Sequence, residues 1–400
     1  MREYPYLIVG GGMTGDAAIR GILEVEPGAS IGLVGEELDP PYNRPPLTKG
    51  LWKGKPLEAV YRKPHAGAVE MTLGRRIVAL DPARHQLTDD QGASYQFGKL
   101  LLATGGDPRR LAFADGLITY FRTLEDYHHL RSQAGPGKRM AVIGGGFIGS
   151  ELAAALLGAG SEVVMAFPEP GIGARLFPAD LARFLVDFYR EKGVEVVDGN
   201  VIVAAARRGE RIEVRFRETE GSAERSFLVD AVVAGLGIAP RIELARSAGL
   251  AVGQGILVDE NLRTNHPDIY AAGDVAEFPS QLLGKRRRVE HEDNALTMGR
   301  LAGGNMAGKA EPYDHEPYFY SDLFELGYEA VGELDPRLET VADWEEEFRK
   351  GVVYYLEGGR VRGVLLWNVW DQVPAARRLI AEPGPFSAQA LIGRLPEGGG

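Results

Sequence analysis

Short apolar runs alternate with amphipathic segments from the first residues of the chain. Tyr6–Val9 and Ile31–Val34 have the length and composition of buried strands, and residues 13–24 between them have the periodicity of a helix. A strand, a helix and a second strand in this order predict a βαβ unit with parallel strands. A further apolar run at 100–104 predicts another strand, which ends at a pair of glycines.

The same order of segments recurs in the middle of the chain. Met140–Ile143 and Glu162–Phe167 are apolar runs, and Phe147–Leu157 between them predicts a helix. The recurrence indicates an internal repeat of a whole βαβ unit, not a short-period solenoid. Another helix is predicted at 179–192, followed by strands and hairpins up to residue 234.

The rest of the chain shows two patterns. Residues 256–276 contain a strand that ends in AAGD, which predicts a return to the first unit. From His315 onward, short aromatic runs such as GVVYYL and GVLLWNVW predict a separate α+β domain with Trp367 and Trp370 in its core. Irregular structure is predicted for the proline- and glycine-rich residues 39–57, and a tail for EGGG at 397–400.

The first predicted strand runs directly into GGGMTG. Gly10, Gly12 and Gly15 have the G-x-G-x-x-G spacing, which gives a tight turn, a close approach to a pyrophosphate and close helix–strand packing. The positive end of the following helix then faces the phosphates. Glu36 ends the second strand, 21 residues beyond Gly15, where a carboxylate accepts hydrogen bonds from ribose hydroxyls. A glycine turn alone is a weak signal, but strand, helix and acid together predict a dinucleotide site.

The repeat carries a second fingerprint, GGGFIG, with Gly144, Gly146 and Gly149. Glu169 lies 20 residues past Gly149. Two fingerprints predict two dinucleotides, one a tightly held flavin and the other an exchangeable hydride donor. The acid favours NADH over NADPH because it binds a 2′-hydroxyl and repels a 2′-phosphate, although Arg175 is near enough in sequence to weaken this preference.

Composition narrows the classes of function. A net charge of −11 argues against binding nucleic acid or anionic membranes through bulk charge. No apolar run approaches the roughly 18 residues that span a bilayer, and the first strand leaves no room for a signal peptide, so a cytoplasmic protein is expected. The chain has no cysteine, which excludes disulfides, thiolate metal sites and cysteine nucleophiles, and the histidines predict no metal site.

Taken together, these motifs resemble those of the FAD-dependent pyridine nucleotide-disulfide oxidoreductase superfamily, in its branch of apoptosis-inducing factor and ferredoxin reductases. The similarity covers nearly the whole chain. Its most specific stretches are RPPLTKGLW (44–52), GGGFIGSELA (144–153), AFPEPGIGAR (166–175), AAGD (271–274), RRRVEHEDNA (286–295), RLAGGNMAG (300–308) and VVYYLEGGRVRGVLLWN (352–368). RPPLTK and RRRVEH are long and unusual enough to be strong signals, whereas G-x-G-x-x-G and AAGD indicate only the superfamily.

This resemblance implies an α/β fold with two Rossmann-like, three-layer ββα dinucleotide-binding domains and a C-terminal α+β domain, the glutathione reductase-like architecture. The implied FAD-binding domain is discontinuous and comprises 1–118 and 248–314. The NAD(H)-binding domain comprises 119–247, and the C-terminal domain 315–400.

Catalytic roles are implied for Lys49, Phe147 and Glu151. Phe147 is the aromatic gate that moves aside for nicotinamide, and Glu151 pairs with Lys49 beside flavin N5. From the residues alone, Lys49 in a loop is by default a solvated surface lysine, and only the flanking RPPLT motif favours a function. Glu151 would ordinarily be a surface charge, but its place in the first turns after a dinucleotide motif favours a function. Phe147 fits a core residue and a gate equally well. A cation at Lys49 makes a flavin easier to reduce, and a helix that opens near His291 directs its positive end at flavin N1.

The implied cofactor-binding residues form two sets, with Pro46 packing beside Pro45 on the flavin. For FAD they are Gly10, Gly12, Gly15, Glu36, Glu37, Arg44, Pro45, Lys49, Ile77, Thr104, Gly105, Arg122, Asp274, Glu290, His291 and Tyr320. For NAD they are Gly144, Gly145, Gly146, Phe147, Ile148, Gly149, Glu151, Glu169, Arg175, Gly237, Glu290, His291, Glu329 and Asn368. Tyr320 stands where close relatives have tryptophan.

The expected function is an FAD-containing, NADH-dependent oxidoreductase. Without cysteine the flavin-to-disulfide route is closed, so electrons leave reduced FAD for an external acceptor: an iron–sulfur protein, a quinone, a dye or oxygen. One alternative is a ferredoxin or rubredoxin reductase of an oxygenase chain. Another is an NADH-responsive redox sensor with a long-lived charge-transfer complex and ligand-driven dimerisation. The oligomeric state is left open between a monomer and a homodimer. The targeting leader and the long C-terminal insertion of the mitochondrial cell-death members are not expected here, so nothing in the sequence supports an apoptotic role.

Overall fold

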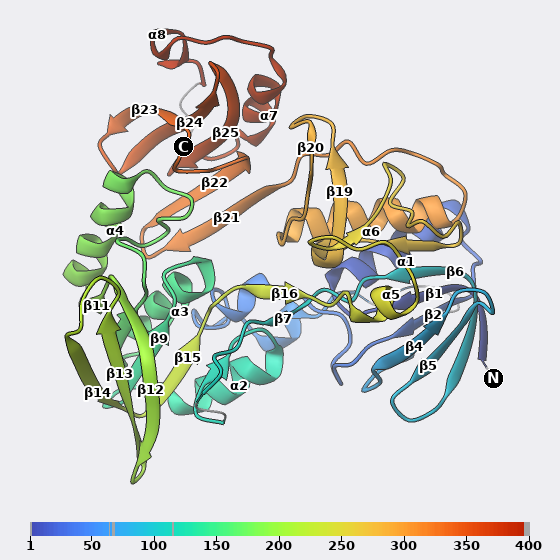
Figure 1. Ribbon diagram of the computed structural model, residues 1–400, viewed down its shortest axis with the longest axis horizontal. Coiled ribbons are helices and arrows are strands. Elements are labelled where there is room, and N and C mark those ends of the chain that lie inside the picture. The colour runs from blue at the N-terminus through green and yellow to red at the C-terminus, as the bar shows by residue number, and fades with distance from the viewer. Residues whose placement is uncertain (1, 64, 66–68, 114–115, 396–400) are drawn as a thin grey trace. The chain divides into compact units, whose positions relative to one another are not determined.

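The structure is a computed structural model that describes residues 2–63, 65, 69–113 and 116–395 (Figure 1). The chain forms two compact units. Unit 1 comprises Met1–Arg44, Pro56–Asp107 and Ala239–Pro317, and unit 2 comprises Pro45–Lys55, Pro108–Ile238 and Tyr318–Gly400. Strands β7 (Gly106–Pro108) and β16 (Ile238–Pro240) lie where the chain passes between the units. The predicted tail at 397–400 lies outside the described residues.

A mixed sheet, in which β4 and β5 are paired antiparallel and the other strands parallel, organises unit 1. Its strands follow the order β3–β2–β1–β6, and β6 pairs along its other edge with β5 over its first residues and with β18 over its last. The strands of this sheet are β1 (Arg2–Val9), β2 (Ile31–Val34), β3 (Val69–Thr72), β4 (Ile77–Asp81), β5 (Gln86–Asp89), β6 (Ser94–Leu102) and β18 (Ile269–Ala271). A second, small sheet contains β17 (Ile256–Leu257), β19 (Ala276–Ser280) and β20 (Lys285–Arg287).

Two helices of unit 1 pack closely on each other, α1 (Met13–Val25) and α6 (Glu292–Met306) (Figure 1). Glycines make this close packing possible. A Cβ added to Gly21 would lie 1.9 Å from the carbonyl oxygen of Arg300, and one added to Gly303 would lie 2.0 Å from that of Ala18. The remaining helical segments of unit 1 are η2 (Leu57–Val60), α5 (Glu243–Ser247) and η3 (Gly273–Val275).

Unit 2 contains the second βαβ unit in three layers. Its parallel sheet has the order β11–β10–β9–β15–β8. Helix α3 packs on β9 and β10, whereas the antiparallel sheet β12–β13–β14 shares a hydrophobic core with the parallel strands. These elements are β8 (Thr119–Tyr120), α2 (Leu124–Gln133), β9 (Arg139–Ile143), α3 (Phe147–Gly158), β10 (Glu162–Ala166), α4 (Ala179–Lys192), β11 (Glu195–Val197), β12 (Asn200–Arg208), β13 (Arg211–Glu218), β14 (Glu224–Val229) and β15 (Ala231–Ala234). Unit 2 also includes η1 (Pro45–Leu47).

An antiparallel sheet of order β21–β22–β25–β24–β23 forms the C-terminal part of unit 2. Its strands are β21 (Tyr318–Leu323), β22 (Leu326–Gly332), β23 (Glu339–Glu346), β24 (Lys350–Glu357) and β25 (Arg360–Trp367), followed by α7 (Val373–Ala381) and α8 (Ala388–Leu391). Trp367 is fully buried, as predicted, but the prediction for Trp370 is wrong because its side chain is 41% exposed. Strand β25 ends at Trp367, and Asn368 has a positive φ of 49°, which turns the chain out of the sheet.

The predicted order of elements is confirmed. The helix predicted at 179–192 has these bounds in the structure, and the helices predicted at 13–24 and 147–157 are each one residue longer. The fold class is therefore an α/β fold with two ββα units and a C-terminal α+β part. Among the described residues, no helix is long and apolar enough to span a bilayer.

Candidate functional site

The first glycine turn connects β1 to α1 in unit 1. Gly10 has a φ of +126°, and a Cβ there would lie 2.1 Å from the carbonyl oxygen of Ala103. A Cβ on Gly15 would lie 2.1 Å from the carbonyl oxygen of Gly10, whereas one on Gly12 would meet nothing within 4 Å. The first and third glycines are therefore required by the fold, and the second leaves open space before the helix. Gly12 is the N-cap of α1 and provides no side-chain cap, so the end of the helix is available to an anion.

The second glycine turn in unit 2 has the same geometry. Gly144 has a φ of +118°, and a Cβ on Gly149 would lie 1.9 Å from the carbonyl oxygen of Gly144. Gly146, the uncapped N-cap of α3, again has open space around it. A Cβ on Gly145 would press on the ring of Phe167 at 2.7 Å, and Ile148 follows within the first turn of α3.

Carboxylates follow the first glycine turn, at the end of β2. Glu37 accepts hydrogen bonds from Arg44 and from the hydroxyl of Tyr42, each at 2.5 Å. The neighbouring Glu36 is paired with Arg241, which also binds Asp107 at 2.8 Å through Nε. The predicted ribose acid is therefore held by a cation from a distant part of the chain.

Arg241 also fixes the end of β6. Its backbone N–H donates to the carbonyl oxygen of Gly105 at 3.0 Å, and its own carbonyl accepts from the hydroxyl of Thr104 at 3.1 Å. Ile77 opens β4 and is buried. Of the other residues predicted to bind FAD, Asp274 lies in η3, Glu290 pairs with Arg288 at 2.6 Å, and Arg122 precedes the N-cap of α2 in unit 2.

His291 is the N-cap of α6, so a helix begins at the predicted place. That this helix directs its positive end at the flavin stays a prediction. Burial lowers its pKa to about 4, while the charges of Asp274 and Asp293 raise the pKa and that of Arg287 lowers it. The folded protein therefore keeps this imidazole neutral over a pH range in which the unfolded chain protonates it.

This difference predicts a dependence of stability on pH. The contribution of His291 is complete above about pH 6.5, and it is lost as the pH falls towards 4, because only the unfolded state takes up the proton in this window. The loss should amount to about 3 kcal/mol. Urea denaturation of the FAD-bound protein at several pH values should show this decline, and His291→Gln should flatten it. Equal slopes in both proteins would contradict the assignment. Asp16, whose pKa is about 2, titrates below this window.

The predicted catalytic pair comes together in unit 2. Lys49 Nζ lies 3.2 Å from Glu151 Oε1, and the two side chains are only 12% and 7% exposed. Both are therefore inside the protein, which rules out the alternative of surface charges. The ammonium group also lies 4.0 Å from the ring centroid of Tyr320. Pro45 and Pro46 precede this pair in η1.

Phe147 is the first residue of α3. Its ring centroid lies 5.3 Å from that of Phe319 on β21 and 6.3 Å from that of Tyr328 on β22. The ring is only partly buried, so it is neither a core residue nor a fully exposed one. This position fits the gate that was predicted, and that role stays a prediction.

Glu329 on β22 and Asn368 directly after β25 differ in their hydrogen bonding. Glu329 Oε2 is buried without a hydrogen-bond partner among the described residues, and burial raises the pKa of this carboxyl group. Asn368, in contrast, accepts from the N–H of Gly327 at 2.7 Å and donates to the carbonyl of Arg349 at 2.9 Å. Glu329 is thus the acceptor that remains available to the amide group of a ligand. Gly237 has a φ of +77° and accepts from the N–H of Arg109.

Glu169 and Arg175 form an ion pair in unit 2, with Arg175 Nη2 at 2.5 Å from Glu169 Oε1. Arg175 is 81% exposed and Glu169 is 22% exposed. The arginine is thus held to the acid and is free to reorient when the acid is absent.

Replacing Glu169 by alanine is expected to weaken the preference for NADH over NADPH. Loss of the carboxylate removes a partner for the 2′-hydroxyl and frees Arg175 for a 2′-phosphate. The ratio of kcat/KM for NADH to that for NADPH should fall by about tenfold or more, equivalent to about 1.4 kcal/mol. Arg175→Ala is the control and should raise the ratio; an unchanged ratio in Glu169→Ala would refute the ribose role.

Sequence reasoning missed several residues of these sites. Thr48 and Ser321 donate to Glu151, and each is adjacent in sequence to a predicted residue, which is the only signal that could have found them. Asp16 is buried and bound by His65 at 2.8 Å and by Arg62. No local pattern links Arg241 to Glu36, which is 205 residues away.

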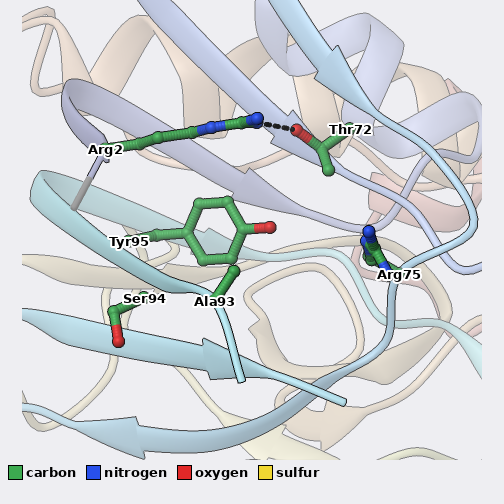
Figure 2. Close-up of a pocket in the computed structure, with 6 residues that line it drawn as sticks. All are labelled: Arg2, Thr72, Arg75, Ala93, Ser94 and Tyr95. Carbon is green, nitrogen blue, oxygen red and sulfur yellow. Dashed lines mark hydrogen bonds between the residues drawn. The ribbon is translucent and has the colours of Figure 1, made fainter. Parts of the chain in front are cut away.

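A pocket of about 440 Å³ in unit 1 has a different lining, shown in Figure 2. The side chain of Arg2 reaches over the ring of Tyr95 to the hydroxyl of Thr72, at 2.9 Å. The remaining lining residues are Arg75, Ala93 and Ser94. Glu70 pairs with Arg2, and Asp89 lies 3.8 Å from Arg75, so both arginines are balanced by acids. None of the residues predicted to bind a dinucleotide lines this pocket.

The described residues fit the two dinucleotides that the fingerprints predict. Open space remains at Gly12 and Gly146, where a pyrophosphate would reach uncapped helix ends. The unpartnered oxygen of Glu329 suits a carboxamide N–H. Among the described residues there is no cluster of side chains that could hold a metal ion.

Comparison with known proteins agrees with this geometry. The family model described as pyridine nucleotide-disulphide oxidoreductase matches residues 4–299. That of the C-terminal part of mitochondrion-associated apoptosis-inducing factor matches residues 302–345 and 342–382.

Individual proteins match over nearly the whole chain. Apoptosis-inducing factor 1 of Dictyostelium discoideum is 33% identical over 95% of this chain and 79% of its own. A ferredoxin reductase subunit of 5,5′-dehydrodivanillate O-demethylase from Sphingobium is 34% identical over 96% of this chain and 94% of its own. The crystal structure of a covalent putidaredoxin reductase–putidaredoxin complex is 30% identical, with a TM-score of 0.88 over 97% of this chain and 95% of that chain. The chain therefore belongs to the pyridine nucleotide-disulphide oxidoreductase family, whose members are flavoproteins that bind FAD and NAD(H).

Proposed function

We propose that this protein is an NADH-dependent flavoprotein reductase that delivers electrons to an iron–sulfur protein of the ferredoxin class. The enzyme takes a hydride from NADH onto FAD and passes electrons to an external acceptor. The observation that carries this proposal is the combination of two open glycine turns with the buried Lys49–Glu151 pair in a chain without cysteine. No internal disulfide can receive the electrons, so they leave the protein.

The proposed acceptor rests on the related proteins. One relative is the ferredoxin reductase subunit of a demethylase, and one similar structure holds a reductase joined to putidaredoxin. A quinone, a dye or oxygen remains a competing acceptor. The net charge of −11 predicts that docking of an acidic ferredoxin depends on a local basic area rather than on bulk charge.

The residues of the chain have separate tasks in this mechanism. Bound FAD supplies an electron carrier that accepts a hydride and releases electrons. The backbone at Gly12 and Gly146 would bind the two pyrophosphates, and Glu36 and Glu169 would accept from ribose hydroxyls. Glu329 would accept from the nicotinamide amide and thereby orient the ring. Phe147 would occupy the stacking position until the nicotinamide arrives, and the Lys49 cation would stabilise negative charge on a bound flavin. No proton-abstracting residue is needed, because hydride transfer is mainly a matter of alignment.

Anaerobic stopped-flow reduction with NADH and with NADPH tests the first half of the proposal, and a panel of acceptors tests the second. NADH should reduce the flavin with the higher kcat/KM, and an added ferredoxin should be reduced rapidly, with a rate that falls as salt increases. Reduction of dyes and oxygen with no reduction of any ferredoxin would refute the proposed acceptor. No reduction of the flavin by either coenzyme would refute the function as a whole.

The similarity to apoptosis-inducing factor favours a second candidate, an NADH-responsive redox sensor. A redox sensor of this kind should show a long-wavelength absorbance band that persists after anaerobic NADH addition, together with a shift in oligomer size. Rapid reoxidation by air with neither change would count against it.

We also propose the three-domain division made from the sequence, with an FAD-binding domain (1–118 and 248–314), an NAD(H)-binding domain (119–247) and a C-terminal domain (315–400). This division is supported by the sheets, because each of the three proposed domains contains one main sheet of its own. Limited proteolysis that cuts near 118 or 247 in preference to other sites would agree with these boundaries.

A further inference from the structure

Two hydroxyl groups hold the buried carboxylate of Glu151. Thr48 Oγ1 donates to Oε2 at 2.5 Å, and Ser321 Oγ donates to Oε1 at 2.6 Å. Thr48 is 5% exposed and Ser321 is fully buried, so water does not compete for these bonds. The donors lie 103 and 170 residues from Glu151 in the sequence, which means that only the folded unit 2 brings them together.

The same carboxylate holds Lys49. The ammonium group lies 3.2 Å from Glu151 Oε1 and 4.0 Å from the centroid of the Tyr320 ring. Contacts with both an anion and an aromatic face restrict where the cation can lie. Lys49 follows Thr48 directly and Tyr320 precedes Ser321 directly, so the segments that provide the two hydroxyls also provide the cation and the ring.

The two hydroxyls determine the orientation of the carboxylate plane. The terminal torsion of a glutamate is broad, so an ion pair alone leaves the carboxylate free to rotate. One donor on each oxygen removes that freedom. Ser321 is itself held in place, because it is fully buried and pairs with Tyr328 of β22 in the antiparallel sheet. The chain of contacts Ser321–Glu151–Lys49 thus begins in this sheet and reaches the cation at its outer end.

We propose that Thr48 and Ser321 are positioning residues of the redox site, whose hydroxyls hold Glu151 so that it fixes the Lys49 ammonium in one orientation towards the flavin. This inference rests on the proposed function, in which Lys49 contacts bound FAD. Neither hydroxyl touches a reacting atom; both act through Glu151 and Lys49. The competing view is that they only satisfy a buried charge and stabilise the fold.

Three variants test the proposal: Thr48→Val, Ser321→Ala and the double variant. Ser132→Ala, which removes an exposed hydroxyl near the end of α2, is the matched control. In the FAD-bound double variant, anaerobic flavin reduction by NADH should be about tenfold slower. The flavin midpoint should be about 30 mV more negative, which is tenfold for a two-electron couple. FAD content should equal that of the parent, and Ser132→Ala should behave as the parent.

Combining the Thr48→Val and Ser321→Ala substitutions with Lys49→Met distinguishes a positioning role of the two hydroxyls from a role in stabilising the fold. When Lys49 is absent, removal of the hydroxyls should change neither the rate nor the midpoint any further, since they act through this residue. Thr48→Ser and Ser321→Thr keep a hydroxyl and should restore the parental midpoint. Equal effects with and without Lys49, or a parental midpoint in the double variant, would overturn the proposal. Titration with dithionite gives the midpoint without NADH, so it tests the positioning role even if NADH fails to reduce the parent protein.

Discussion

Replacing Gly146 by valine is expected to abolish NADH-dependent reduction while the protein stays folded with FAD bound. Gly146 has a φ of −89° and a ψ of −167°, which any residue can adopt, and an added Cβ would meet no atom within 4 Å. The fold therefore tolerates the side chain. The pyrophosphate of NADH does not, because it must approach the backbone at this position. The KM for NADH should rise by at least about 100-fold, equivalent to about 2.7 kcal/mol.

Gly149→Ala is the matched comparison for this prediction. A Cβ at Gly149 would lie 1.9 Å from the carbonyl oxygen of Gly144, so even alanine must displace the turn from α3. We expect this variant to lose free energy of unfolding as well as NADH binding, whereas Gly146→Val should lose only binding. Denaturant unfolding and stopped-flow reduction of both variants measure the two quantities. A Gly146→Val protein with parental KM would show that NADH does not bind at the second glycine turn.

The second large effect is expected at Lys49. Lys49→Met keeps most of the length of the side chain but removes the cation, so hydride transfer from NADH should slow by about 100-fold. The midpoint of the flavin should become more negative, because a positive charge beside the flavin favours its reduced form. FAD should stay bound, since many other residues are predicted to hold it. Glu151 would be left as a buried carboxylate with its two hydroxyl donors.

Lys53→Met is the control for this substitution, because Lys53 is exposed and lies in the same short segment of the chain. It should leave both the rate and the midpoint as in the parent. Reduction rates are measured by anaerobic stopped flow at saturating NADH, and midpoints by spectroscopic titration. If Lys49→Met has the parental rate and midpoint, the predicted position of Lys49 beside the flavin is wrong.

Much of the fold could be predicted from the sequence because its signals are local. Each glycine turn has a local part, the positive φ of Gly10 (+126°) or Gly144 (+118°) and the close approach of Gly15 to Gly10 or of Gly149 to Gly144, and this part is marked by a pattern of six residues. The close approach of Gly10 to Ala103 and of Gly144 to Gly235 joins distant parts of the chain and is not visible in that pattern. Helix α4 has the predicted bounds because its apolar face repeats with the period of a helix and Gly193 follows it with a φ of +101°.

The tertiary structure decided which side chains meet and how deeply they are buried. A turn at Asn368 placed Trp370 outside the core although the apolar pattern continues past it. The partners of Glu151 come from segments more than 100 residues away, and the partner of Glu36 from one 205 residues away. Periodicity shows that a residue can lie on a helix or a strand. The free energy of burying a charge depends on the donors that surround it, and only the folded chain brings those donors together.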